Sequence, residues 1–234
     1  MAQELTARVK EIIQRAYNVK SVRLDIGGKI DFKAGQFLSV TLAGDPVLKR
    51  YLSISSSPTE QGYVEFTKKL TNSDFSKALS QLNPGDSLKI EYPFGKFTLD
   101  GPGTDIAFLS GGIGITPIRS IAKYTVDKNL GTDMVLVYAN HSLKDIIFKE
   151  DFEVMQKAYP KLKVVHVLGK PAAGFQCISG RINAQVIKQE VGNYPRRKFY
   201  LCGPPQMVEA MNKILTEDLN LAKENIVTEN FQGY

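Results

Sequence analysis

The chain has 234 residues, with 30 lysines and arginines against 24 aspartates and glutamates, so its net charge is +6. Hydrophobic residues make up 43% and charged residues 23%, which is typical of a folded protein and excludes a disordered chain. The two cysteines, Cys177 and Cys202, are too few for a disulfide scaffold, a four-cysteine zinc site or a four-cysteine iron–sulfur cluster, and we expect no metal site.

Charge and apolar runs restrict the partners and the location. The apolar runs fall short of the ~18–20 residues of a membrane span, and the N-terminal stretch has early acidic residues and no apolar signal-peptide core. We therefore expect no membrane span and a cytoplasmic location. The basic residues form no long run with interleaved aromatic residues, so nucleic acid is not an expected partner. A basic surface suits an acidic protein or a phosphorylated ligand.

Residues 1–100 are predicted to form a small antiparallel β-barrel. Alternation of apolar and polar residues between turn sequences predicts strands over 21–26, 36–42, 50–55, 63–69 and 87–91. A short helix over 73–82 interrupts them, because capping residues at 72–74 precede apolar residues at helical spacing.

Residues 101–234 are predicted to form a Rossmann-like α/β unit, after a linker over 100–103. Predicted strands alternate with predicted helices along this half, which implies a parallel sheet covered by helices. The strands are expected over 105–110, 133–138, 162–168 and 198–202, and the helices over 118–127, 148–159, 183–190 and 205–219.

Two turn sequences follow strands of this sheet, where open parallel sheets bind ligands. The first contains Gly111, Gly112 and Gly114, which let the backbone approach a diphosphate, and Thr116 and Pro117, which can open a helix. Since Pro117 replaces the third glycine of the dinucleotide fingerprint, the segment predicts either a dinucleotide site or a tight turn.

The second turn is Cys202-Gly203-Pro204-Pro205, a rigid entry into a helix. Cys202 is either functional or a small buried apolar residue, and neither His141 nor His166 is placed to make it a nucleophile. In the first half, Arg50 and the serines of 53–57 form either a ladder for a polar ligand or a solvated edge strand.

Taken together, these segments resemble the ferredoxin–NADP(H) reductase superfamily over nearly the whole chain. The motifs that carry the resemblance, in the family's order, are Gly35-Gln36-Phe37, Arg50-Tyr51-Leu52-Ser53, Pro93-Phe94-Gly95-Lys96-Phe97, the segment 111–117 and Cys202-Gly203-Pro204-Pro205-Gln206-Met207. The resemblance implies a flavin-binding barrel over 1–100 and a nicotinamide-binding domain over 101–234. The implied chemistry is hydride transfer from NAD(P)H to flavin, with electrons passed onward one or two at a time.

The resemblance also implies roles for individual residues. Arg50 is expected to pair with the flavin diphosphate, and Ser53 to hydrogen-bond near flavin N5 and assist the hydride step. Lys68, Ser73 and Ser76 are expected to hold the ribityl and diphosphate groups. The nicotinamide nucleotide is expected to contact Gly111, Gly112, Gly114, Thr116 and Pro117, and its ring to lie beside Cys202 in a pocket shaped by Gly203 and Pro204.

One motif departs from the family. Many relatives read Arg-x-Tyr-Ser, whereas this chain has Leu52 at the tyrosine position and Tyr51 one residue earlier. A shift of one residue on a strand moves a side chain to the other face. We therefore expect Leu52 to offer an apolar contact, and Tyr51, also a cofactor-binding candidate, not to stack as the family tyrosine does.

The C-terminus resembles relatives that end in an aromatic residue covering the flavin. Phe231 or Tyr234 would take that role, and the alternative is a frayed tail. Glu229 is a further candidate for a polar contact near the flavin.

The cofactors follow in part from the same segments. FAD is favoured over FMN, because the helix over 73–82 could hold a diphosphate that FMN lacks. NADPH and NADH both remain open, since Ser142 and Lys144 favour a 2′-phosphate and Asp145 disfavours it.

We expect the electron acceptor to be a separate carrier or a small molecule, because the chain lacks the four cysteines of the [2Fe–2S] domain that some relatives carry. The basic surface favours an acidic ferredoxin or flavodoxin. The alternatives are reduction of free flavin or small acceptors, and a flavin-binding electron-transfer subunit of a larger complex. We expect a monomer or weak dimer.

Overall fold

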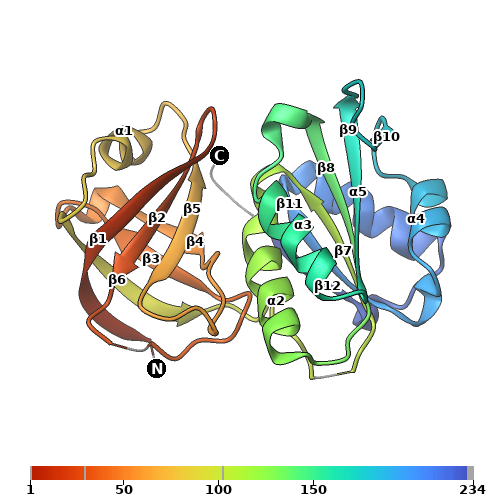
Figure 1. Ribbon diagram of the computed structural model, residues 1–234, viewed down its shortest axis with the longest axis horizontal. Coiled ribbons are helices and arrows are strands. Elements are labelled where there is room, and N and C mark those ends of the chain that lie inside the picture. The colour runs from red at the N-terminus through yellow and green to blue at the C-terminus, as the bar shows by residue number, and fades with distance from the viewer. Residues whose placement is uncertain (1, 29, 102, 231–234) are drawn as a thin grey trace.

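The computed structural model describes residues 2–28, 30–101 and 103–230. Its first half is a β-barrel and its second half is a parallel sheet between two layers of helices, lying side by side (Figure 1). The change from antiparallel to parallel pairing falls between β6 and β7, on either side of the 100–103 segment. Among the described residues, no helix is both long enough and apolar enough to cross a membrane.

The barrel is a sheet of strand order β4-β3-β6-β1-β2-β5, antiparallel throughout, as the alternation predicted. A bridge between Ile54 and Phe66 joins the edge of β4 to β5 and closes it. Its elements are β1 Gln3–Ala16, β2 Val19–Asp25, β3 Phe37–Thr41, β4 Lys49–Ser53, β5 Val64–Lys69, α1 Asp74–Ser80 and β6 Ser87–Phe94.

The strand β1 was not predicted. Leu5, Ala7 and Val9 alternate, but the register against β2 shifts between Val9 and Glu11 and again between Gln14 and Ala16. Each shift adds a residue to one strand and inverts the alternation of side chains. The 14-residue strand therefore lacks the continuous alternation of apolar and polar residues by which a strand is predicted.

The second sheet has the order β10-β9-β8-β7-β11-β12, and all its neighbours are parallel. The chain moves from β7 to β8 on one side and later returns to β11 on the other, so β7 lies at the switch point where such sheets bind ligands. Its elements are β7 Ile106–Gly111, α2 Ile115–Lys128, β8 Met134–Ser142, α3 Lys149–Ala158, β9 Leu162–Lys170, β10 Ile178–Ser179, α4 Ala184–Glu190, β11 Lys198–Gly203, α5 Pro205–Lys213, a π-helical turn Ile214–Asp218 and β12 Ile226–Asn230.

Two apolar layers cover this sheet. The helices α2 and α3 pack on the face toward the barrel, and α4 and α5 pack on the opposite face (Figure 1). The barrel residues Val19, Ala34 and Phe97 belong to the same apolar cluster as α2. Gly35 contacts α2 so closely that a Cβ there would lie 2.9 Å from the Ile121 side chain. The helix α2 therefore joins the two halves.

Candidate active site between the barrel and the parallel sheet

Three polar side chains lie level with one another near the carboxyl ends of neighbouring strands. Cys202 of β11 pairs in register with Ser110 of β7 on one side and with Glu229 of β12 on the other. Their strands place all three on the sheet face toward the barrel, since Phe108, Tyr200 and Cys202 belong to the apolar cluster of that face. Ser110 Oγ and Glu229 Oε2 are buried without a hydrogen-bond partner in the described chain. Buried polar atoms of this kind point to a ligand that would satisfy them.

Burial determines the protonation of Cys202 and Glu229, the two titratable residues in the row that they form with Ser110. It raises the pKa of the Glu229 carboxyl to about 7. Burial and the neighbouring Glu229 carboxylate raise the pKa of the Cys202 thiol well above its usual value. Cys202 is therefore a neutral thiol at neutral pH, which argues against a nucleophile. Glu229 can gain or lose a proton in the physiological range.

The barrel meets this row at Gly95. A Cβ at Gly95 would lie 3.7 Å from Glu229 Oε1 and 2.7 Å from the ring of Phe37. Phe37 in turn pairs with Ser53 across β3 and β4. Ser53 is 3% exposed, and its Oγ has no hydrogen-bond partner among the described residues. Unpaired polar atoms thus lie on both sides of the junction between barrel and sheet.

A pair of cations lies on the barrel side of the junction. Lys68 is buried on β5, and both its burial and the nearby Arg50 guanidinium lower the pKa of its ammonium group. The Arg50 guanidinium also lies 5.5 Å from the ring of Phe75 on α1. Lys68 is buried and Arg50 is exposed beside it. Two neighbouring cations favour an anion near them, as a diphosphate would supply.

The α1 serines are placed beside Phe75 as predicted, but their hydroxyls are engaged. Ser73 Oγ caps the helix by accepting from the Ser76 backbone amide at 3.3 Å, and Ser76 Oγ lies 3.2 Å from Thr71 Oγ1. Any contact of Ser73 or Ser76 with a ligand therefore shares these hydroxyls with the helix cap.

Tyr51 and Leu52 lie on opposite faces of β4, as the one-residue shift implies. Tyr51 is 59% exposed and packs edge-on against Phe37 at 5.8 Å and Phe94 at 5.6 Å. Leu52 belongs to the barrel's apolar cluster.

A cavity of about 630 Å³ runs along the carboxyl ends of β7, β8 and β9. Gly111, Gly112 and Pro204 line it at the switch point, and Asn140, His141, Asp145 and Arg181 line it further along the sheet. The barrel contributes Asn18 from the β1–β2 hairpin and Lys69 from β5. A cavity of this size at this edge suits a nucleotide.

Glycines let the two turns over this cavity touch. A Cβ at Gly114 would lie 2.2 Å from the Cys202 carbonyl oxygen, and one at Gly111 would lie 2.3 Å from Met207 Sδ. Gly203 packs against the Gly111 backbone in the same way. Gly112 differs, because it has a φ of +52° and open space beside it. Packing therefore accounts for three glycines, and Gly112 faces the cavity.

The start of α2 is equally compact. Thr116 is 2% exposed, and its hydroxyl donates to the Ile113 carbonyl at 3.1 Å. Pro117 follows in the first turn, where its missing N–H costs no helical hydrogen bond. Both residues shape the turn rather than offering a free polar group.

Of the segment after β8, Asp145 lines the cavity. Its Oδ2 accepts from the Ser142 backbone N–H at 2.9 Å and from the Ser142 hydroxyl at 2.6 Å. The Ser142 hydroxyl is thus already used, and the carboxylate is held in place.

Some residues of the site escaped the sequence analysis. Ser110 was placed at the end of a strand and the start of the glycine-rich turn, but it was given no role in the site. Lys69 was placed on a predicted strand, of which Lys68 was the candidate for binding. Arg181 lies in a loop for which the sequence predicted no element. The serines after Ser53 were expected to face a ligand or solvent, but Ser55, Ser56 and Ser57 are fully buried at the junction. Phe231 and Tyr234 lie outside the described residues.

Comparison with known proteins identifies the family. The model of the oxidoreductase FAD-binding domain matches residues 5–99, and that of the oxidoreductase NAD-binding domain matches residues 108–213. The chain is 33% identical over 208 residues to NADH-cytochrome b5 reductase 1 of Mortierella alpina, covering 86% of this chain and 68% of that protein. The chain belongs to the ferredoxin–NADP(H) reductase superfamily.

Further matches include one curated relative of which this chain spans less than two thirds, and two solved structures that share the fold. The glycine betaine monooxygenase reductase subunit of Pseudomonas aeruginosa is 32% identical over 220 residues, which is 89% of this chain and 59% of that protein. The fold matches the cytochrome b5 reductase domain of Ulva prolifera nitrate reductase with a TM-score of 0.86, at 22% identity and 97% coverage of each chain. The ferredoxin reductase in carbazole 1,9a-dioxygenase gives a TM-score of 0.84, at 24% identity, over 98% of this chain and 70% of that one.

The cofactors of the superfamily fit the residues present. The barrel is an FAD-binding domain and the parallel sheet an NAD-binding domain, so the preference for FAD over FMN is confirmed. Arg50 and Lys68 supply positive charge for a diphosphate, and the unpaired Ser53 and Glu229 oxygens suit polar ring atoms. The site is therefore suited to both groups.

Proposed function

We propose that this chain is an NADH-dependent reductase that holds FAD and passes electrons to a separate carrier protein. Bound FAD supplies the chemistry, accepting a hydride from the nicotinamide and releasing electrons singly or in pairs. The observation that carries the proposal is the row Ser110, Cys202 and Glu229 facing Ser53 across the junction, with buried polar atoms unpaired on both sides.

Each residue of the site then has a task. Arg50 and Lys68 bind the diphosphate, and the Ser53 hydroxyl donates to the flavin ring. Cys202, as a neutral thiol, packs beside the nicotinamide without attacking it. Glu229 holds a proton at its buried carboxyl, and Gly112 gives the nucleotide access to the backbone.

NADH is preferred to NADPH in this proposal. The Asp145 carboxylate lines the cavity at the end of β8, where it would accept from a ribose 2′-hydroxyl and repel a 2′-phosphate. Arg181 also lines the cavity and would attract a phosphate, so Asp145→Ser should raise the use of NADPH relative to NADH. The relation to an NADH-cytochrome b5 reductase supports the same preference.

An exposed aromatic cluster marks where a carrier would dock. Phe37, Tyr51 and Phe94 pack together beside Gly95, and Lys49 lies 5.8 Å from the Tyr51 ring. Lys49 is also paired with Glu91 at 2.9 Å, so the positive charge that would attract a carrier comes from the chain's net charge of +6. Aromatic side chains on a basic protein suit an acidic carrier such as a ferredoxin, a flavodoxin or a cytochrome. The rate of carrier reduction should then fall as salt is added.

A second candidate is the reductase subunit of an oxygenase complex, which the similarity to the glycine betaine monooxygenase reductase subunit favours. Reduction of free flavin or small acceptors is a third.

Steady-state assays with NADH separate these possibilities. Ferredoxin, flavodoxin, cytochrome b5, riboflavin and ferricyanide are each supplied as sole acceptor. Salt-sensitive reduction of a protein carrier supports the proposal, whereas turnover with riboflavin that exceeds every carrier would favour the flavin reductase. Bound FAD that NADH reduces without any turnover would favour a subunit that needs its complex.

A further inference from the structure

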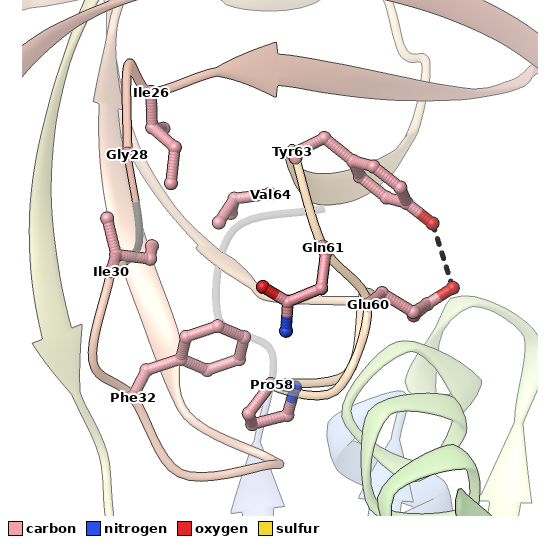
Figure 2. A pocket seen from close by; sticks show the side chains of 10 residues that line it. Ile26, Gly28, Ile30, Phe32, Pro58, Glu60, Gln61, Tyr63 and Val64 are labelled. Atoms are coloured by element: carbon pink, nitrogen blue, oxygen red, sulfur yellow. Dashed lines mark hydrogen bonds between the residues drawn. The ribbon is translucent and has the colours of Figure 1, made fainter.

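The loop after β4 is anchored to the barrel through Glu60. Tyr63 Oη donates to Glu60 Oε1 at 2.8 Å (Figure 2). The Ser57 backbone N–H donates to Glu60 Oε2 at 2.7 Å. The hydrogen bonds and charge of Arg119 lower the pKa of Glu60 although burial opposes the charge. Glu60 therefore presents a fixed carboxylate toward the other half of the molecule.

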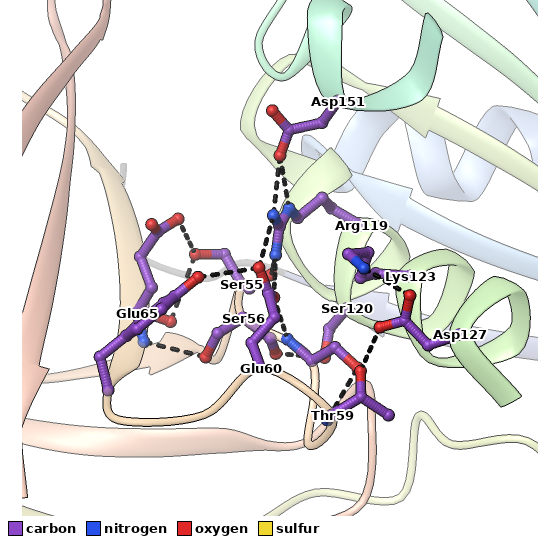
Figure 3. Close-up of polar contacts among 12 residues, drawn as sticks. Ser55, Ser56, Thr59, Glu60, Glu65, Arg119, Ser120, Lys123, Asp127 and Asp151 are labelled. Carbon is purple, nitrogen blue, oxygen red and sulfur yellow. Dashed lines mark hydrogen bonds and ion pairs between the residues drawn. The ribbon is translucent and has the colours of Figure 1, made fainter. Parts of the chain in front are cut away.

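Arg119 of α2 reaches this carboxylate from the parallel-sheet half (Figure 3). Its side chain is 6% exposed and donates to Glu60 Oε1 at 3.0 Å, to Asp151 Oδ2 of α3 at 2.8 Å and to the Ser55 carbonyl at 3.0 Å. Burial opposes the charge, but Glu60 and Asp151 raise the pKa of Arg119 above its usual value. One guanidinium thus ties together the barrel, α2 and α3.

Ser120 makes a second tie beside the first. Its hydroxyl donates to the Ser56 carbonyl at 2.6 Å, and the group is fully buried. On the barrel side, Ser55 N–H donates to the Glu65 carbonyl at 2.7 Å, and Glu65 N–H donates to Ser56 Oγ at 2.9 Å. The segment after Ser53 is therefore fixed between β5 and α2.

Phe148 completes the junction. Its ring lies 4.9 Å from the Arg15 guanidinium of β1 and 5.5 Å from that of Arg119. Its φ of +59° lies in the left-handed region, which is unfavourable for a bulky residue. Contact of the ring with a cation from each half holds the start of α3 to both halves.

The same helix begins at the nucleotide cavity. The glycine turn over 111–114 leads directly into α2, and Arg119 and Ser120 lie within its first two turns. A hydrogen-bonded helix moves as a unit, so the position of this turn relative to the barrel depends on where α2 is fastened. Arg119 and Ser120 bind α2 to the backbone of Ser55 and Ser56, which lie two and three residues after Ser53.

We propose that Arg119 and Ser120 are positioning residues for hydride transfer. By bonding Ser55 and Ser56, they set the distance and angle between the nicotinamide over the glycine turn and the flavin beside Ser53. This inference rests on the proposed function. Hydride transfer is sensitive to such placement, since a misplacement of ~1 Å can cost roughly 100-fold in rate.

The test compares Ser120→Ala with Thr125→Val in the FAD-loaded protein. Both remove one buried hydroxyl from α2, but among the described residues the Thr125 hydroxyl donates within its own helix, to the Ile121 carbonyl at 2.9 Å. Arg119→Lys keeps the charge and cannot meet all three acceptors together. Anaerobic stopped-flow measures flavin reduction at saturating NADH, with NADH and with its 4-deuterated form, alongside FAD content and thermal midpoint.

We expect Ser120→Ala to slow flavin reduction about 3- to 10-fold and Arg119→Lys to slow it at least 10-fold. FAD content and NADH affinity should stay near wild type, the deuterium isotope effect should change, and Thr125→Val should reduce flavin at the wild-type rate. Wild-type rates and isotope effects in both Ser120→Ala and Arg119→Lys would overturn the inference. The inference would also be overturned if the rate of flavin reduction fell in proportion to the thermal midpoint in all three variants alike. No reduction in the wild-type protein would instead overturn the proposed function.

Discussion

Glu229 and Cys202 face the same side of neighbouring strands, paired in register across β12 and β11. The carboxylate raises the pKa of the thiol, and burial raises the pKa of the carboxyl itself to about 7. A neutral thiol and a carboxyl that titrates near neutral pH thus lie side by side on the sheet face toward the barrel. This proximity comes from the sheet register, because β12 places Glu229 beside Cys202.

Glu229 should make stability depend on pH. Its pKa is raised on folding from 4.5 to about 7, so its contribution is complete below about pH 4.5 and is lost as pH rises through 7. The loss in the free energy of unfolding is at most about 3–4 kcal/mol. Urea unfolding of wild type and Glu229→Gln at about pH 5 and about pH 8 gives the change in unfolding free energy with pH for each protein. The difference between the two changes is the contribution of Glu229. An identical change in both proteins would refute the burial of an ionisable Glu229, and Glu224→Gln is the exposed control.

Cys202→Ala should separate hydride transfer from flavin binding. The thiol lies in the row beside the cavity, whereas the cations that would bind the diphosphate lie on the barrel. We expect flavin reduction by NADH to slow about 10-fold or more with FAD affinity unchanged, since placement of the nicotinamide is disturbed. Cys177→Ala, at the other, partly exposed cysteine, should change neither quantity. Wild-type reduction by Cys202→Ala would remove Cys202 from the site.

Arg50→Ala should weaken FAD binding. Charge-assisted hydrogen bonds to phosphate contribute about 1.5–3 kcal/mol, so the dissociation constant should rise roughly 10- to 100-fold. Lys68→Met should act in the same direction, because the two cations share one location. Titration of the apoprotein with FAD measures both, and Arg8→Ala on the outside of β1 controls for the change in net charge. Equal affinities in Arg50→Ala and Arg8→Ala would contradict the assignment of the diphosphate.

Gly35→Ala should disrupt the contact between barrel and α2. A Cβ there would lie 2.0 Å from the Phe97 carbonyl oxygen at a φ of +93°. Gly44→Ala is a matched control, since Gly44 also has a positive φ of +68° but open space around it. We expect Gly44→Ala to cost about 1 kcal/mol in unfolding free energy and Gly35→Ala several times more. The same Cβ would also lie 2.9 Å from the Ile121 side chain of α2. Equal costs in the two variants would show that Gly35 does not pack this closely against Phe97 and α2.

The sequence predicted the elements whose periodicity is regular. Strands over 105–110 and 133–138 and the helix over 118–127 match β7, β8 and α2 closely, because buried parallel strands and amphipathic helices carry strong patterns. The helix expected over 205–219 is divided, with α-helix to Lys213 and a π-helical turn beyond it.

The junction could not be predicted in the same way. The register shifts of β1 interrupt its alternation, and β12 is short and close to the C-terminus, so the pattern of the sequence predicts neither strand. Glu229 therefore could be named only through the family resemblance, and its pairing with Cys202 depends on β12. Arg119 and Ser120 are polar and lie between the apolar positions of α2, so a helical pattern assigns them to the solvent side. Only the tertiary structure shows that the barrel covers them.

The most direct measurement is anaerobic mixing of the FAD-loaded protein with NADH, followed by the flavin absorbance in a single turnover. The proposed function predicts rapid loss of the oxidised-flavin band with NADH, slower loss with NADPH, and recovery of the band when an acidic carrier protein is added. A protein that binds FAD and is reduced by neither nucleotide would contradict it.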